Sequence, residues 1–177
     1  MIIFLDEFGF SFLEPISTTW APKGQRPIFR RVTKDRRALS TIAALALTGK
    51  VYKLHFAGSM SSQQVIRFLK HLQQHLPGNI ILIWDRARIH TGAATQKYLL
   101  DHREIHQEFL PAYAPELNPE EYCHGNVKRY LKNARPKDKK QMQTLLNLGF
   151  ARFRRKPALL LKFFHSAGLN VRQFQLL

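Results

Sequence analysis

Cysteine is nearly absent from the sequence, which contains only Cys123. A single cysteine excludes an internal disulfide and a zinc site built from several cysteines, and it is typical of a reducing cytosolic or nucleoid setting. Long apolar runs are absent too, because none approaches the roughly 20 residues that a membrane-spanning helix needs. The N-terminal segment lacks the basic part of a secretory signal peptide and reaches Asp6 too early. We therefore expect no association with a membrane.

Acidic residues are also scarce. Only 12 Asp and Glu stand against 28 Lys and Arg, which gives a formal net charge of +16 and a pI of about 10.5. This balance favours a polyanionic partner, most often nucleic acid. The competing interpretation is a ribosomal or other basic scaffold protein. The charge gathers toward the C-terminus, since residues 122–177 hold 13 Lys and Arg and a single acid, Asp138.

Length and composition predict one folded domain. A chain of 177 residues with 45% hydrophobic residues is large enough for a proper core and too apolar for a disordered tail. No internal repeat or low-complexity linker divides the sequence. We therefore expect residues 1–177 to form a single domain, with residues 137–177 as its basic, helical C-terminal part.

Hydrophobic periodicity predicts the order of the secondary structure. Short apolar runs bounded by turn residues predict strands, and apolar residues at helical spacing predict helices. The predicted strands are 2–5, 39–47, 51–56, 79–84 and 105–110, and the predicted helices are 61–76, 92–102, one that begins at 119, 139–155 and 158–166. Residues 20–27 (WAPKGQRP) are a predicted loop. A hairpin combined with crossover helices indicates an α/β fold, with a mixed sheet of about five strands flanked by helices.

Three of the few carboxylates lie at predicted element ends. Asp6 and Asp85 each follow a buried strand, and Glu121 falls in the first turn of a helix. Ligands of such sheets bind at the carboxyl ends of strands, so we expect these side chains to converge. Carboxylates from different elements can hold two Mg²⁺ ions about 4 Å apart, as phosphodiester hydrolysis and strand transfer require. A single Asp at a strand end is, however, also common in ordinary turns.

The segment LPAYAPELNPEEY, residues 110–122, resembles the third catalytic motif of DDE-superfamily transposases. The similar branch is that of the bacterial insertion-sequence enzymes related to mariner elements. Their motif has an aromatic residue, a Pro-acid-Leu-Asn-Pro turn, and a catalytic acid two residues after the second proline. Glu121 occupies the position of that acid.

The rest of the chain resembles the same family. IWDRARIHT, residues 83–91, is similar to the second motif, with Asp85 as its acid and His90 downstream. MIIFLDEFGF is similar to the first motif, with Asp6 as its acid, and WAPKGQRP resembles a further family segment. The 35 residues between the second and third acids are close to the spacing typical of the family.

This resemblance implies an RNase H-like fold and dependence on Mg²⁺ or Mn²⁺, with two ions. Asp6 and Asp85 are the implied ligands of one or both ions, and Glu121 completes the catalytic and metal-binding set. The family cuts DNA at element ends by activating water and then uses the freed 3′-hydroxyl to attack target DNA. The implied partners are DNA and a second copy in a synaptic homodimer, and the implied location is the bacterial cytoplasm, at the nucleoid.

Two alternatives stay open at this point. A catalytically silent or truncated remnant would bind DNA without cutting it. Another RNase H-like nuclease, such as a hybrid-specific ribonuclease or a junction resolvase, would use a similar set of acids, although the LNPEE turn speaks against it.

The chain departs from the family at three points. Arg86 stands where many relatives have Asn, and CHGN at 123–126 stands where many have Trp. Full-length relatives also carry N-terminal helix-turn-helix domains, for which this sequence has no room before Asp6. We interpret the chain as a fragment, a degraded copy, or the second frame of a gene whose product is completed by an upstream helix-turn-helix reading frame.

Several basic residues are candidate DNA contacts, because they lie beside the predicted site or cluster at a helix end. These residues are Arg86, Lys128, Arg152, Arg154, Arg155 and Lys156. In the helix that begins at 119, Gly125 costs roughly 1 kcal/mol relative to Ala and indicates a close approach of another backbone or of DNA.

Three rival acids and two histidines lie near the predicted ligands. Glu116 is expected to organise the turn before the helix. Glu7 is expected on the opposite face of the strand from Asp6, and Glu120 lies about 100° around the helix from the preferred Glu121. His90 is either close to the site or a structural histidine. His124 is left out of the ligand set, because a hard ion prefers oxygen.

Overall fold

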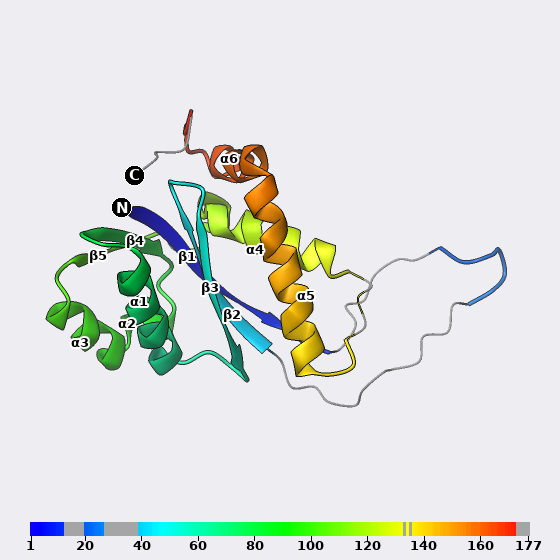
Figure 1. Ribbon diagram of the computed structural model, residues 1–177, viewed down its shortest axis with the longest axis horizontal. Helices are drawn as coiled ribbons and strands as arrows, with labels where there is room; N and C mark the ends of the chain where they lie inside the picture. Colours follow the sequence, from blue (N-terminus) through cyan, green and yellow to red (C-terminus); the bar gives the residue numbers. More distant parts are fainter. Residues whose placement is uncertain (13–19, 27–38, 133, 135, 173–177) are drawn as a thin grey trace.

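The computed structural model describes residues 1–12, 20–26, 39–132, 134 and 136–172. They form a five-stranded sheet in the order β3-β2-β1-β4-β5 (Figure 1). The strands are β1 (Ile2–Phe10), β2 (Leu39–Ala46), β3 (Val51–Ala57), β4 (Ile80–Trp84) and β5 (Ile105–Phe109). β2 is antiparallel to both β1 and β3, whereas β4 runs parallel to both β1 and β5. The predicted mixed sheet with an antiparallel hairpin is therefore confirmed.

Helices cover both faces of the sheet (Figure 1). On one face lie α1 (Ser62–His75), α2 (Arg88–Thr91) and α3 (Ala93–Asp101), and on the other lie α4 (Pro119–Tyr130), α5 (Lys139–Ala151) and α6 (Pro157–Ser166). Two short 3-10 helices, η1 (Pro115–Leu117) and η2 (Arg152–Arg155), precede α4 and α6. Each helical layer buries its own hydrophobic core against the sheet. The molecule thus has three layers.

Strand β1 sends alternate side chains to the two helical layers, as the pleat of a strand requires. Ile3 and Leu5 belong to the core with α1 and α3, whereas Phe4 belongs to the core with α4, α5 and α6. Asp6 continues the second series and faces α4, and Glu7 continues the first and faces α2. The prediction that these two acids lie on opposite faces is confirmed.

Strand β1 is longer than the predicted strand 2–5, and the prediction that Asp6 lies at its carboxyl end is wrong. Asp6 lies in the middle of β1, where it pairs with Ala43. The antiparallel partner β2 holds β1 in register as far as Phe10. Apolar periodicity misses this extension because two acids interrupt it, while pairing with β2 supplies backbone hydrogen bonds regardless of side chain.

Local sequence explains several element ends. Ser61 begins α1 with a capping box, in which the Gln64 side chain accepts the Ser61 N–H at 2.8 Å. Pro157 occupies the first turn of α6, and Gly168 follows that helix with a φ of +78°. These residues fix the start of α1 and both ends of α6.

Other details differ from the predictions. The short helix α2 is not among the predicted elements, and the predicted helix 139–155 divides into α5 and η2. β4 is not buried on both faces, because Ile81 is 38% exposed. The predicted loop is irregular over residues 20–26, and Pro27 lies outside the described residues. Over the described part of the chain, no helix is long and apolar enough to cross a membrane.

Candidate metal centre

The side chains of Asp6, Asp85 and Glu121 line one pocket, a cavity of about 430 Å³. Asp6 comes from the middle of β1, Asp85 directly follows β4, and Glu121 lies in the first turn of α4. Most of the remaining lining comes from the irregular segment 110–115 that follows β5. The convergence that the sequence predicted is therefore present.

Strand register brings the two aspartates together. The parallel pairing joins Phe4 of β1 to Ile83 of β4, and β4 ends at Trp84. The same offset places Asp6 level with Asp85, at the point where β4 stops and β1 continues. Both carboxylates therefore lie at the carboxyl edge of the parallel pair, where α/β sheets bind ligands.

Asn118 brings the third acid to this edge. Its Oδ1 accepts the Glu120 N–H at 3.1 Å, which caps α4, and its Nδ2 donates to the Leu5 carbonyl at 3.2 Å. The residue is buried, so it ties the start of α4 to β1 beside Asp6. Sequence reasoning did not identify this role, although Asn before Pro is a signal for a helix start.

On the other face of β1, His90 lies between two carboxylates. Its Nε2 donates to Glu7 Oε1 at 2.9 Å, and its Nδ1 lies 2.9 Å from Asp85 Oδ1 and 3.0 Å from the Asp85 backbone carbonyl oxygen. The ring is 1% exposed and stacks on Trp84 with ring centroids 4.1 Å apart. His90 therefore combines both interpretations that the sequence left open: it is a buried structural histidine, and it contacts a pocket acid.

These contacts set the charge states of His90 and Asp85. Burial by itself lowers the pKa of His90, but its hydrogen bonds to the Asp85 and Glu7 carboxylates together outweigh burial and raise the pKa to about 9. The same hydrogen bond from His90 lowers the pKa of Asp85. Near neutral pH His90 is thus an imidazolium, and Asp85 is a carboxylate that is ready to bind a cation.

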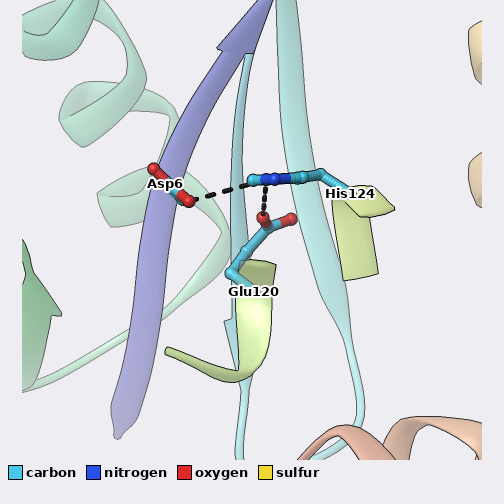
Figure 2. Close-up of side chains that lie close together, drawn as sticks. All are labelled: Asp6, Glu120 and His124. Atoms are coloured by element: carbon cyan, nitrogen blue, oxygen red, sulfur yellow. Dashed lines mark hydrogen bonds and ion pairs between the residues drawn. The ribbon is translucent and has the colours of Figure 1, made fainter. Parts of the chain in front are cut away.

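On the α4 side, His124 contacts three acids. Its Nε2 lies 2.6 Å from Glu121 Oε2, and its Nδ1 lies 3.2 Å from Glu120 Oε2 and 3.5 Å from Asp6 Oδ2. Figure 2 shows Asp6 from the strand and Glu120 from the helix both directed at the imidazole. Sequence spacing placed His124 near Glu121 but gave no sign of its contact with Asp6, which depends on the packing of α4 against β1.

Crowding of acids in the interior shifts their protonation. Burial, followed by the charges of Glu121 and Glu7, raises the pKa of Asp6 to about 8. Burial, followed by the charge of Asp6, raises the pKa of Glu120 well above its usual value. Without a bound cation these acids retain protons, and a cation that binds there displaces them.

The oxygens at the centre fit a divalent cation. Asp6 Oδ2 is buried and has no hydrogen-bond partner in the described part of the chain. Asp85 Oδ1 is fixed by the Ala87 N–H at 2.9 Å and by His90, while no bond is found for Oδ2 within the described residues. Oxygen atoms of this kind are the ligands that Mg²⁺ and Mn²⁺ prefer.

Of the predicted DNA-contacting residues, only Arg86 lines the pocket. Its guanidinium lies 4.7 Å from the centre of the Phe109 ring. Lys128 lies on α4 with its amino group 5.7 Å from the centre of the Phe8 ring. The other four, Arg152, Arg154, Arg155 and Lys156, belong to η2 or follow it directly, and none of them lines the pocket.

The sequence matches the family of DDE superfamily endonucleases over residues 1–143. The chain belongs to this family. The matched segment contains the three pocket carboxylates, and the family resemblance that the motifs indicated is confirmed. No curated protein matches this DDE-family chain.

Solved structures share the fold of this DDE-family chain. The mariner Mos1 paired end complex with Mg has a TM-score of 0.66 at 21% identity, covering 98% of this chain and 56% of that chain. The catalytic domain of Mos1 mariner transposase has a TM-score of 0.57 at 19% identity, covering 95% of this chain and 82% of that chain. A simian T-cell lymphotropic virus intasome, in complex with PP2A regulatory subunit B56 gamma, has a TM-score of 0.59 at 14% identity, covering 84% of this chain and 46% of that chain.

These likenesses confirm the predicted RNase H-like fold. The DDE-family chain spans little more than half the length of the Mos1 chain in the paired end complex.

Proposed function

We propose that this chain is the catalytic domain of a DDE-type transposase. In this role it hydrolyses phosphodiester bonds at the ends of a mobile element and joins the freed 3′-hydroxyl to target DNA. The observation that carries the proposal is the convergence of Asp6, Asp85 and Glu121 in one pocket of a strongly basic chain. Membership of the DDE endonuclease family supports it.

Asp6, Asp85 and Glu121 are the proposed catalytic and metal-binding residues. Asp6 and Asp85 offer carboxylate oxygens to divalent ions, and Glu121 completes the ligand set. Two bound Mg²⁺ or Mn²⁺ ions would neutralise the charge on the attacking and leaving oxygens of the phosphodiester. Two of the similar structures are Mos1 paired end complexes with Mn and with Mg, which supports the choice of ion.

DNA is the proposed substrate, because a net charge of +16 favours a polyanion. Arg86 is placed to contact a phosphate within the pocket. The other proposed phosphate contacts lie on α4 and η2 or directly after η2: Lys128, Arg152, Arg154, Arg155 and Lys156. These contacts would hold the backbone of the DNA without reading its sequence.

The proposal extends to the assembly. Residues 1–177 form one catalytic domain, with 137–177 as its basic part, and two copies act together on paired element ends. A similar Mos1 structure, a paired-end complex with the left transposon end, supports the pairing of ends. The proposed location is the bacterial cytoplasm, at the nucleoid.

A plasmid-nicking assay tests the proposed function. The 177-residue chain is incubated with supercoiled DNA and Mg²⁺, Mn²⁺ or a chelator, beside Asp85→Asn, Glu121→Gln and the control Glu116→Gln. Glu116 is an exposed acid of the same turn that does not line the pocket. We expect metal-dependent nicking by the wild type and the control, and background nicking by the other two variants.

Two results would count against the proposal. A folded Asp85→Asn variant that nicks DNA as fast as the wild type would remove Asp85 from the site. Salt-sensitive DNA binding by the wild type, without cleavage in either metal, would instead support a DNA-binding remnant.

A further inference from the structure

Glu120 and His124 form a second polar cluster with Asp6 (Figure 2). Glu120 is 0% exposed and His124 is 5% exposed, so solvent does not compensate their polar atoms. One ligand-type atom from each residue lies within 4.8 Å of the other two. Neither Glu120 nor His124 has a part in the proposed cleavage chemistry.

The imidazole of His124 is oriented as a ligand. Its Nε2 donates to Glu121 Oε2 at 2.6 Å, which places the ring hydrogen of the neutral tautomer on Nε2. The lone pair of Nδ1 then points toward Glu120 Oε2 and Asp6 Oδ2. Glu120 Oε2 lies within hydrogen-bond distance of Nδ1, at 3.2 Å, so either a proton or a cation can lie between these two atoms.

One oxygen of the cluster has no partner. Asp6 Oδ2 is buried and accepts no hydrogen bond from the described residues, and the same is true of Glu120 Oε1, the carboxyl oxygen that does not contact His124. Glu120 is fully buried and its carboxyl group is directed into the cluster, as Figure 2 shows. A buried carboxyl group without full hydrogen bonding is costly, and a bound cation removes that cost.

We propose that Asp6, Glu120 and His124 bind one divalent transition-metal ion, of the class of Zn²⁺ and Co²⁺, with the Asp6 carboxylate shared between this ion and the pocket ions. Ligand atoms about 2.1 Å from a tetrahedral zinc ion lie about 3.4 Å apart. His124 Nδ1 lies 3.2 Å from Glu120 Oε2 and 3.5 Å from Asp6 Oδ2, close to that spacing. Imidazole nitrogen selects such ions over Mg²⁺.

The contact between His124 and Glu121 supports this assignment. A histidine that binds a metal usually donates its other ring N–H to a carboxylate, which fixes the ring and its tautomer. His124 makes this bond to Glu121, which also lines the pocket. An ion in this cluster would therefore hold both Asp6 and Glu121 in position. This last consequence rests on the proposed function, whereas the binding of the ion does not.

Cobalt titration of the metal-free, 177-residue chain tests the proposal. We expect one tightly bound Co²⁺ with the intense visible absorption of four-coordinate cobalt, in both the wild type and Asp85→Asn. Glu120→Gln and His124→Gln should each weaken binding at least tenfold. The control is His55→Gln, which removes a half-buried histidine of β3 that bonds Thr41 at 2.8 Å, away from the cluster. It should bind Co²⁺ as the wild type does.

The proposal is overturned if Glu120→Gln and His124→Gln bind Co²⁺ as tightly as the wild type, or if Asp85→Asn abolishes binding. Should the cluster variants not fold, the melting temperature of the wild type and Asp85→Asn decides: it rises with Zn²⁺ if the ion binds, and stays unchanged if the cluster holds only protons. If the chain nicks DNA but binds no Co²⁺ at this cluster, only the inference of this ion is overturned. If it binds Co²⁺ as expected but does not nick DNA, only the proposed function is overturned.

Discussion

His90 controls how Asp85 is presented to the pocket. Both of its ring nitrogens face carboxylates, so the imidazole must carry two hydrogens to satisfy them. The contact with Asp85 Oδ1 holds in place the carboxylate of a residue that lines the cavity. Glu7, on β1, accepts the hydrogen bond from the other ring N–H of His90. Glu7 does not line the pocket, but through His90 it helps to hold Asp85, which does.

The protonation of His90 gives a prediction for pH dependence. Its pKa in the folded chain is about 9 against an ordinary value of 6.5, so its stabilising contribution is complete below about pH 6.5 and is lost as pH rises through 9. Nitrogen NMR of the metal-free chain should show a doubly protonated His90 ring at pH 7.5. Glu7→Gln should lower this pKa by about 1 unit or more, because it removes one of the two paired charges. A ring that is neutral at pH 7.5 in the wild type would contradict this account.

Individual site residues differ in how far the sequence can predict them. Asp6, Asp85 and Glu121 stand in recognisable motifs, so the sequence alone predicts that they converge in one pocket. The motifs do not reveal that His124 meets Asp6, because that contact joins residues 118 positions apart through the packing of α4 on β1. Periodicity likewise cannot show a long-range hydrogen bond such as that of Asn118 to Leu5.

At the scale of elements, helices α4 and α5 contain glycines in contrasting settings. A methyl group on Gly125 of α4 would meet no atom within 4 Å, so the expected close approach of another backbone is wrong within the described chain. A methyl group on Gly149 of α5 would lie 3.1 Å from Val127 and 3.2 Å from Tyr130. The small residue at position 149 therefore lets α5 pack closely against α4.

This contrast predicts opposite effects of the same substitution. Gly125→Ala should raise the free energy of unfolding by about 0.5–1 kcal/mol, because alanine favours the helix and meets no neighbour. Gly149→Ala should lower it by about 1 kcal/mol, because overpacking against the buried Val127 outweighs the helix preference. Urea unfolding measures both values. Equal stabilisation by the two substitutions would show that α5 does not lie so close to α4.

Whole elements are predicted well where the apolar pattern is uninterrupted. The hairpin β2–β3 and the helix α1 lie close to their expected positions, because short apolar runs mark the two strands and apolar residues at helical spacing mark the helix. The far half of β1 escapes prediction, because Asp6 and Glu7 break the apolar run that marks the strand. The acids of the site are therefore the reason why the sequence pattern underestimates the length of β1.

At the scale of the whole molecule, charge separates the pocket from its surroundings. Three acids line the cavity, while the chain carries a net charge of +16. Cations in the pocket would offset that local negative charge, and the basic residues elsewhere would bind the DNA backbone. The molecule thus combines a local cation site with a surface suited to a polyanion.

The dependence of DNA binding on salt tests this division. Each lost phosphate contact reduces the slope of log binding constant against log salt concentration by about 0.9. Replacing Arg152, Arg154 and Arg155 together by Gln should therefore reduce the slope by about 2 to 3. Arg103→Gln, an exposed control between α3 and β5, should leave it unchanged. An unaltered slope in the triple variant would remove η2 from the DNA-binding surface.

Anomalous diffraction from crystals of this chain soaked in Mn²⁺ tests the central claim most directly. The account predicts a manganese peak inside the pocket, bound by Asp6 and Asp85 with Glu121 beside it, and no such peak in Asp85→Ala crystals. A map without manganese in the pocket, or with manganese only at carboxylates outside it, would contradict the claim that these three acids form the metal centre of a nuclease.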